Sequence, residues 1–263
     1  MRLNVQDRSV YIYTAGHRID SVLPSLVFIH GGEQDHSAWA LQSRYFAYHD
    51  RNVLVPDLPG HGRSKGPALA SIPALADWLA GLLDAAGIEK VGMAGHSMGS
   101  LVALEFAARA SSRVARLALL GTVAPMPVAP ALLDEARKND HAALDMINNW
   151  SHSNRAHLGG NTAPGMWMLG MNMRLMERQS RDVLFTDFSA CNDYTGGADA
   201  AVRVKCPVLI IAGSRDQMTP LRATQEFMRR IPHAQTVLLE GAGHALMSEQ
   251  PDAVLDADRK SVV

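Results

Sequence analysis

Short apolar runs alternate with longer stretches of helical periodicity along the first half of the chain. The short runs are mostly bounded by glycine, proline or charged residues, as strands buried on both faces should be. They fall at residues 10–13, 26–29, 53–55, 91–94 and 117–120. Between them, helical spacing of apolar residues occurs at 38–48, 72–86 and 98–110. This alternation predicts an α/β fold with a mostly parallel central sheet flanked by helices.

The alternation is interrupted in the middle of the chain. Prolines and glycine pairs divide this middle segment into helical pieces, and it contains no convincing strand. The rhythm then resumes with a strand at 208–212, a helix at 219–230, a strand at 236–239 and a helix that begins near 249. We therefore predict a core domain formed by residues 1–122 and 202–263, and a helical cap formed by residues 123–201.

The composition is that of a compact globular protein. A chain of 263 residues suffices for one large α/β domain, and 47% of its residues are hydrophobic. Because 25 basic side chains accompany 26 acidic ones, we expect neither nucleic acid nor a membrane as a partner. The two cysteines give no disulfide framework, and the sequence has neither a secretory signal nor an apolar membrane span. We therefore expect a cytoplasmic protein.

A G-x-S-x-G pentapeptide lies directly between the predicted strand at 91–94 and the helix that begins at Met98. A serine on so tight a turn has a strained backbone, and the residues two positions away must be small so that strand and helix can approach. Gly95 and Gly99 meet this need. The turn exposes the hydroxyl of Ser97, and the helix N-terminus supplies N–H groups where an oxyanion would form. The motif therefore predicts Ser97 as a nucleophile.

A nucleotide-binding turn is the alternative interpretation of Gly92, Gly95 and Gly99. A dinucleotide fingerprint is followed by an acidic residue about 20 residues further on. The corresponding segment here, Ser111-Ser112-Arg113, contains none, and the chain has no Tyr-x-x-x-Lys motif. We therefore expect no cofactor.

The general base and its orienting acid should follow the nucleophile in the order Ser, Asp, His. Asp216 follows the predicted strand at 208–212, and His244 follows the strand at 236–239, so both should lie at the carboxyl edge of the sheet. Alone, Asp216 is explained as a turn or helix-cap residue and His244 as a loop histidine. In this order behind Ser97, the two predict a catalytic triad.

An oxyanion hole requires two N–H donors, and we predict those of Met98 and Gly32. Gly32 follows the strand at 26–29, and its missing side chain would let a substrate oxygen approach the backbone. His30 is interpreted as a buried structural histidine that ties loops together. None of the 11 histidines has the His-x-His or His-Glu-x-x-His spacing of zinc sites, so we expect no metal.

Taken together, these motifs resemble the α/β-hydrolase superfamily, and within it the small bacterial carboxylesterases and their lactonase, perhydrolase and carbon-carbon hydrolase relatives, which carry a helical cap. The matching segments are His30-Gly31-Gly32, Asp57-Leu58-Pro59-Gly60-His61-Gly62-Arg63-Ser64, Gly95-His96-Ser97-Met98-Gly99, Gly213-Ser214-Arg215-Asp216 and Gly241-Ala242-Gly243-His244. The resemblance covers nearly the whole chain and implies the α/β-hydrolase fold and hydrolysis without a metal or cofactor.

Two positions depart from the pattern of this family. Ser100 replaces the second glycine of the usual Ser-x-Gly-Gly ending, a mild change behind the turn. Glu33 places a carboxylate beside Gly32, where it would oppose a developing negative charge. We therefore expect the Glu33 side chain to point away from the site.

The predicted cap is rich in methionine, and seven of the 13 methionines lie within it. Several of them follow helical spacing, which indicates first a cap helix packed on the core. The inner face of such a helix also forms the roof of a pocket, and a methionine lining is apolar and adaptable. The predicted substrate contacts are Trp39, Trp150, Trp167, Met168 and Met171, with core packing as the alternative for Trp39.

These inferences predict a serine hydrolase that cleaves a carboxylic ester of small to medium apolar acyl or aryl type through an acyl-enzyme. Sugars and phosphates are disfavoured because clustered arginines are lacking. The same residues would serve lactone opening, carbon-carbon bond hydrolysis or perhydrolysis, which the sequence separates poorly. A ligand-binding protein that keeps the fold without turnover is the rival from another class, and the complete trio argues against it.

Overall fold

Eight strands form one sheet in the order β1-β2-β4-β3-β5-β6-β7-β8. The computed structural model describes residues 1–160 and 165–262, apart from the side chains of 258–262. The strands are β1 Arg2–Val5, β2 Arg8–Tyr13, β3 Ser25–Ile29, β4 Asn52–Pro56, β5 Val91–His96, β6 Val114–Leu120, β7 Val208–Gly213 and β8 Gln235–Leu239. The β1/β2 and β2/β4 pairs are antiparallel, and the remaining pairs are parallel. The predicted mostly parallel α/β sheet is therefore confirmed.

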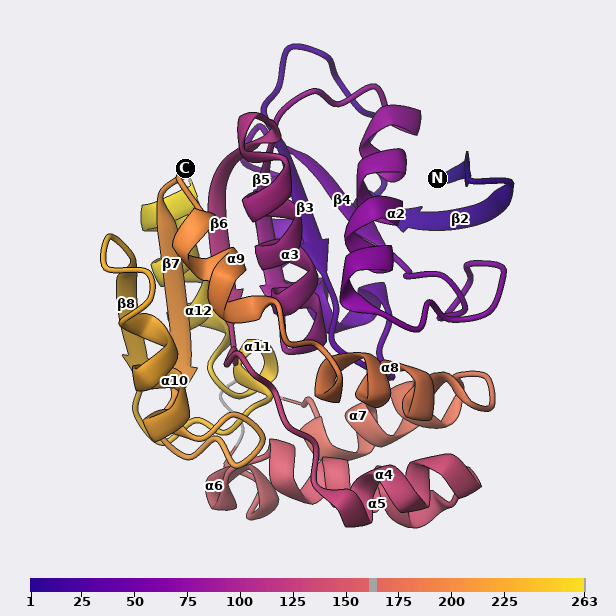
Figure 1. Ribbon diagram of the computed structural model, residues 1–263, viewed down its shortest axis with the longest axis vertical. Coiled ribbons are helices and arrows are strands. Elements are labelled where there is room, and N and C mark those ends of the chain that lie inside the picture. The colour runs from indigo at the N-terminus through magenta and orange to yellow at the C-terminus, as the bar shows by residue number, and fades with distance from the viewer. Residues whose placement is uncertain (161–164, 263) are drawn as a thin grey trace.

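Helices cover both faces of the sheet (Figure 1). One face carries α2 Ile72–Ala85, α3 Met98–Arg109, α9 Gly197–Arg203 and α10 Leu221–Met228, and the other carries α1 Ala40–Ala47 and α12 Pro251–Val262. The short helices are η1 His36–Trp39, η2 Ser111–Arg113 and α11 Leu246–Glu249. Because both faces are covered, every residue of β3, β4, β5 and β7 is buried, which explains their continuous apolar runs.

Five helices between β6 and β7 lie together beyond the carboxyl ends of the parallel strands (Figure 1). They are α4 Pro130–Lys138, α5 His141–Ser151, α6 Asn154–His157, α7 Met168–Glu177 and α8 Val183–Asn192. Residues 161–164 of the predicted cap lie outside the described residues. Within the described part of the chain, no helix is both long and apolar enough to cross a membrane.

The predicted cap boundary at residue 201 falls inside α9. Ala200 and Ala201 of this helix are buried in the same apolar cluster as Leu104 and Ala107 of α3. Helix α9 therefore packs with the layers of the core, and the helices that lie over the sheet edge end with α8 (Figure 1).

Candidate active site

Ser97 lies at the sharp turn between β5 and α3, with φ 53° and ψ −121°. A side chain at either flanking glycine would collide with backbone: a Cβ on Gly95 would lie 2.2 Å from the Gly99 carbonyl oxygen, and one on Gly99 would lie 2.4 Å from the Ile29 carbonyl oxygen. The Ser97 N–H donates to the Leu120 carbonyl oxygen at 3.0 Å, which anchors the turn to β6. The strain at Ser97 is thus held by close packing on both sides.

Asp216 and His244 meet at the carboxyl edge of the sheet, where His244 Nδ1 lies 2.8 Å from Asp216 Oδ2. Thr219 donates to the same carboxylate through its N–H at 2.8 Å and its hydroxyl at 2.6 Å, and the Met218 N–H adds a bond of 2.8 Å. Burial would raise the pKa of Asp216, but His244 and these hydrogen bonds outweigh it and lower the pKa below its ordinary value. Asp216 is therefore a buried carboxylate that fixes the imidazole by its Nδ1 atom.

The loop that carries His244 is tied down on three sides. The carbonyl oxygen of His244 lies 2.9 Å from His96 Nε2. On either side of His244, the Gly243 N–H donates to Glu249 at 3.0 Å, and the Ala245 N–H donates to the Ser151 carbonyl oxygen at 2.8 Å. Burial, together with the nearby His244, lowers the pKa of His96 to about 3, so this imidazole is neutral and its Nε2–H is the donor. His96, which sequence reasoning missed, directly precedes the nucleophile and joins it to the histidine loop.

No hydrogen bond joins Ser97 Oγ to His244 among the residues that the structure describes. The closeness of the two residues is seen from the groups around Gly121, which follows the Leu120 carbonyl that binds Ser97. A Cβ on Gly121 would lie 2.9 Å from His244 Cε1 and 3.5 Å from His96 Nε2. The structure therefore brings all three predicted triad residues to one edge, with only the Asp216–His244 pair hydrogen-bonded.

The two predicted oxyanion donors lie beside this edge. Met98 is the first residue of α3, so its N–H has no intrahelical acceptor. Within residues 1–160 and 165–262, the Gly32 N–H likewise makes no hydrogen bond. A Cβ on Gly32 would lie 3.1 Å from Phe188 Cε1 and 3.3 Å from Asp187 Cβ, both on α8. A Cβ here would be tight against α8, which gives a second reason for a glycine besides the substrate approach expected from the sequence.

His30 has the structural environment predicted for it. Its Nε2 accepts the Leu58 N–H at 3.1 Å, and its Nδ1 lies 2.8 Å from the Gly31 carbonyl oxygen. Burial lowers the pKa of His30 to about 4, so the ring is neutral and Nδ1 carries the proton. The histidine ties the loop after β3 to the loop after β4.

A cavity of about 490 Å³ opens at Ser97 between the core and the cap. Its lining is apolar apart from a few polar groups, and among the described residues that line it no side chain is charged. The lining residues are Ser97, Val123, Pro125, Met126, Pro127, Val128, Ala129, Leu132, Trp150, Phe188, Cys191, Gln217, Met218, Thr219, Pro220 and Ala223. Trp150 is the only one of the five predicted substrate contacts among them.

The other four predicted contacts lie elsewhere. Met168 and Met171 line a second cavity of about 410 Å³, which reaches His96. Trp39 is fully buried in the core against Phe28, with ring centroids 5.2 Å apart, so its indole is used for packing. Trp167 is 77% exposed, and its ring lies over Gly170 on the surface of α7. Neither of these two tryptophans lines the cavity at Ser97.

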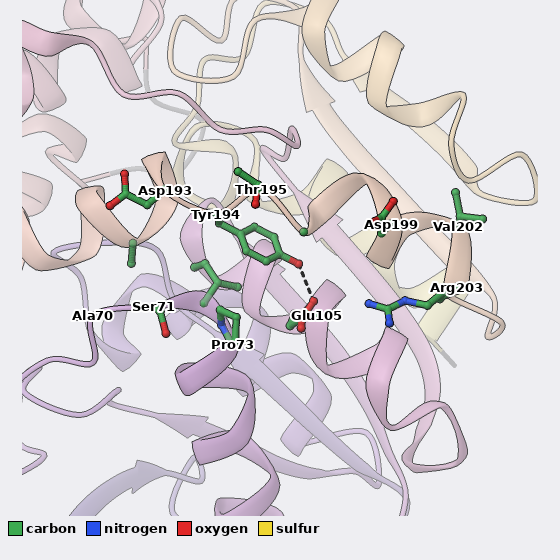
Figure 2. A pocket seen from close by; sticks show the side chains of 13 residues that line it. Ala70, Ser71, Pro73, Glu105, Asp193, Tyr194, Thr195, Asp199, Val202 and Arg203 are labelled. Carbon is green, nitrogen blue, oxygen red and sulfur yellow. Dashed lines mark hydrogen bonds between the residues drawn. The ribbon is translucent and has the colours of Figure 1, made fainter.

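A larger surface cavity of about 780 Å³ lies between α3 and the segment that joins α8 to α9 (Figure 2). Its inner wall contains Tyr194, whose hydroxyl donates to Glu105 at 2.7 Å. None of the predicted catalytic residues lines it. This cavity is therefore separate from the one at Ser97.

Ligand atoms suitable for a metal occur together at Asp35, His36 and Asp57, all within 4.8 Å of one another. These carboxylates already have donors: the Arg178 guanidinium lies 2.5 Å from Asp35, and Asp57 accepts the N–H groups of His36 and Arg63, each at 2.8 Å. The group therefore connects the loop after β3, the loop after β4 and helix α7.

The comparisons with known proteins agree with this architecture. The model of the alpha/beta hydrolase family matches residues 26–257, and the chain therefore belongs to this family. It is 29% identical over 261 residues to a pimeloyl-acyl-carrier-protein methyl ester esterase of Aromatoleum aromaticum, covering 89% of this chain and 97% of that protein. It is 26% identical over 243 residues to an (E)-2-((N-methylformamido)methylene)succinate hydrolase of Acinetobacter baylyi, covering 88% of each.

Solved structures show the same fold. The enol-lactonase of Burkholderia xenovorans superposes with a TM-score of 0.87 at 24% identity, covering 99% of this chain and 98% of that one. An esterase from Thermogutta terrifontis gives a TM-score of 0.84 at 23% identity, covering 99% and 96%. The two sequence relatives named above are hydrolases, and these solved structures share the fold of this chain.

Proposed function

We propose that this protein is a serine hydrolase that cleaves carboxylic esters of small to medium apolar acyl or aryl type. His244 takes the Ser97 proton as Ser97 Oγ attacks the ester carbonyl, and the alcohol leaves with that proton. Asp216 stabilises the imidazolium, and the N–H groups of Met98 and Gly32 receive the oxyanion. Water, activated by His244, then attacks the acyl-enzyme and releases the acid.

The observation that carries this proposal is the strained Ser97 in the lining of an apolar cavity, near a histidine held by a buried carboxylate. Strained non-glycine backbones persist where the surrounding structure fixes them, and they cluster at active sites. Catalytic hydrogen bonds are often long until substrate binds, so the lack of a direct Ser97–His244 bond does not oppose the assignment.

The lining of the cavity supports the substrate class. An uncharged apolar wall favours an apolar acyl or aryl group, because a sugar or phosphate would need hydrogen-bonding or cationic partners. A volume of about 490 Å³ suits an acyl chain of small to medium length. The relatives named above act on an ester and on a succinate derivative, which is consistent with acyl chemistry at this site.

The proposal is tested with a Ser97→Ala variant on p-nitrophenyl esters of graded acyl length. We expect kcat to fall by at least about 10³-fold, and a fluorophosphonate probe to label the wild-type protein but not the variant. Ser43→Ala is the matched control, since this hydroxyl is buried in α1 without a hydrogen-bond partner among the described residues. If the Ser97→Ala variant kept wild-type kcat, Ser97 would not be the nucleophile. Lactones and a dienone acid in the same panel show whether another carbonyl substrate is preferred.

A further inference from the structure

Three ionisable side chains that the proposed mechanism does not use meet beside Gly32. Glu33 comes from the loop after β3, His61 from the loop after β4 and Asp187 from the cap helix α8. All three are buried, with exposures of 6%, 1% and 1%. Burying three such groups is costly unless they are paired. Their placement therefore calls for an explanation.

The hydrogen bonds of this cluster converge on one atom. Asp187 Oδ2 lies 2.8 Å from His61 Nε2 and accepts the Glu33 backbone N–H at 2.9 Å. The other ring nitrogen of His61, Nδ1, lies 3.0 Å from the Pro59 carbonyl oxygen. Both ring nitrogens face acceptors, so both carry protons and His61 is an imidazolium. Asp187 and His61 thus form a buried ion pair that joins the cap to the core.

Glu33 differs from its two neighbours. Burial and the nearby Asp187 carboxylate raise its pKa to about 8, so its carboxyl is neutral near neutral pH. It therefore does not oppose a negative charge at Gly32, although it points into the interior and not toward solvent. Its backbone is in the left-handed region, with φ 55°, which is costly for a residue with a side chain. The bond from its N–H to Asp187 helps to hold that conformation.

The same helix also packs on Gly32. The closest neighbours of a Cβ at this glycine would be Phe188 and Asp187. Helix α8 therefore contacts Gly32 and binds the N–H of the next residue, Glu33. The bond to Asp187 fixes the peptide that follows the Gly32 Cα, and the bond from His30 Nδ1 to the Gly31 carbonyl oxygen, at 2.8 Å, holds the peptide that carries the Gly32 N–H.

We propose that Asp187 is a positioning residue for the reaction: from the cap, it holds the Glu33 N–H and so keeps the Gly32 N–H directed at the oxyanion. This inference rests on the proposed function. If Asp187 has this role, helix α8 influences kcat and also forms a wall of the substrate cavity. A cap that merely covered the site would affect KM and substrate choice instead.

The experiment compares three variants on one p-nitrophenyl ester. Asp187→Ala removes the acceptor, and Asp187→Asn keeps an oxygen for the Glu33 N–H but loses the charge that holds His61. Tyr194→Phe is the control, because it also removes one buried hydrogen bond, the one from the segment after α8 to Glu105 of α3 (Figure 2). Tyr194 is far from Gly32 in the sequence and does not line the cavity at Ser97. Each variant is checked for folding by circular dichroism.

We expect Asp187→Ala to lower kcat by about 10- to 100-fold with KM changed less than about threefold, since a misplaced oxyanion donor costs rate more than binding. Asp187→Asn should lose about three- to tenfold, and Tyr194→Phe should keep its kcat. A trifluoromethyl ketone forms an oxyanion adduct with a serine, so its inhibition constant should rise in step with the loss of kcat/KM. A role confined to stability would leave that constant unchanged.

The dependence of kcat on pH above neutrality gives a second test of the role of Asp187. Burial would lower the pKa of His61, but Asp187 outweighs it and raises the pKa to about 9. The other ionisable groups facing the pair are Glu33, His30 and Cys191. Wild-type kcat should therefore fall above about pH 8 as Glu33 and then His61 lose their protons. In Asp187→Asn, where His61 has no carboxylate partner, kcat should already be low and this decline should be weaker.

The proposal is overturned if Asp187→Ala is folded and keeps wild-type kcat, if its trifluoromethyl ketone affinity is unchanged, or if Tyr194→Phe loses as much rate. If Asp187→Ala does not fold, wild-type kcat in Asp187→Asn overturns it equally. Failure of the proposed function itself would be seen separately, as undiminished activity of Ser97→Ala or no labelling by the fluorophosphonate.

Discussion

Replacement of Glu33 by glutamine should change how the stability of the protein depends on pH. The pKa of Glu33 is raised from 4.5 to about 8, so folding takes up a proton between these values. Stability contributed by that proton is complete below the unfolded pKa and is lost as pH rises toward the folded one. Each unit of pKa shift corresponds to about 1.4 kcal/mol, which makes the loss on the order of a few kcal/mol. Glutamine keeps the shape and removes the titration.

His61 adds to the loss in the same direction. Its pKa is raised from 6.5 to about 9 by Asp187, in opposition to burial, so its contribution is complete below pH 6.5 and disappears as pH rises through about 9. The wild-type protein should therefore become steadily less stable from about pH 5 to about pH 9. The Glu33→Gln variant should retain only the part of this slope that His61 contributes. Above about pH 8, the variant should be the more stable of the two proteins.

The assay is urea unfolding followed by circular dichroism at fixed ionic strength across this pH range. Glu89→Gln is the matched control, because Glu89 is exposed on the surface and its replacement should leave the wild-type slope unchanged. A Glu33→Gln variant with the full wild-type slope would refute the reasoning, since the buried carboxyl would then not be a linked proton site.

Substitutions at three further positions test other parts of the site. His96→Leu should lower kcat about tenfold, because it releases the His244 carbonyl oxygen. His96→Gln, whose amide can reach that oxygen, should restore most of the rate, and equal kcat in both variants would contradict this. Gly95→Ala should lower the free energy of unfolding by more than about 3 kcal/mol, because the alanine Cβ would lie 2.2 Å from the Gly99 carbonyl oxygen. Urea unfolding measures this change, and a variant of wild-type stability would refute the prediction. Trp150→Ala enlarges the cavity at Ser97, so the kcat/KM ratio of octanoate to acetate esters should rise about tenfold; an unchanged ratio would exclude Trp150 as a wall of the acyl site.

The fold was largely predictable from local patterns. Strands β3 to β7 were expected from apolar runs because helices cover both faces of this part of the sheet, so burial leaves a strong signal in the sequence. Strands β2 and β8 were expected as well, although β8 has only one buried residue, Leu239. Strand β1, Arg2–Val5, was missed because it has only four residues, and its two apolar residues, Leu3 and Val5, alternate with polar ones and form no apolar run. The end of the cap was placed inside α9 because the packing of that helix on α3 depends on tertiary contacts that periodicity does not report.

Predictions about single residues succeeded where the backbone conformation of a turn leaves no room for a side chain. Gly95 and Gly99 are needed by any sharp strand-to-helix turn, and the close backbone contacts at both positions follow from that turn alone. Trp39 and Trp167 carry no such constraint. One indole lies in the core and the other at the surface, and the sequence around them does not distinguish a pocket wall from either place.

Gly32 shows where sequence reasoning about the site ends. Two causes give the same residue at this position: room for a substrate oxygen, and room for a helix that lies more than 150 positions further along the chain. The contacts add the second cause to the first, since a Cβ on Gly32 would lie 3.1 Å from Phe188 Cε1, and the same helix supplies Asp187 to the neighbouring N–H. A motif records that the backbone must be free of a side chain, but not which group fills the space. The partner is set by how the cap folds back over the sheet edge, so the link between cap and oxyanion loop becomes visible only in three dimensions.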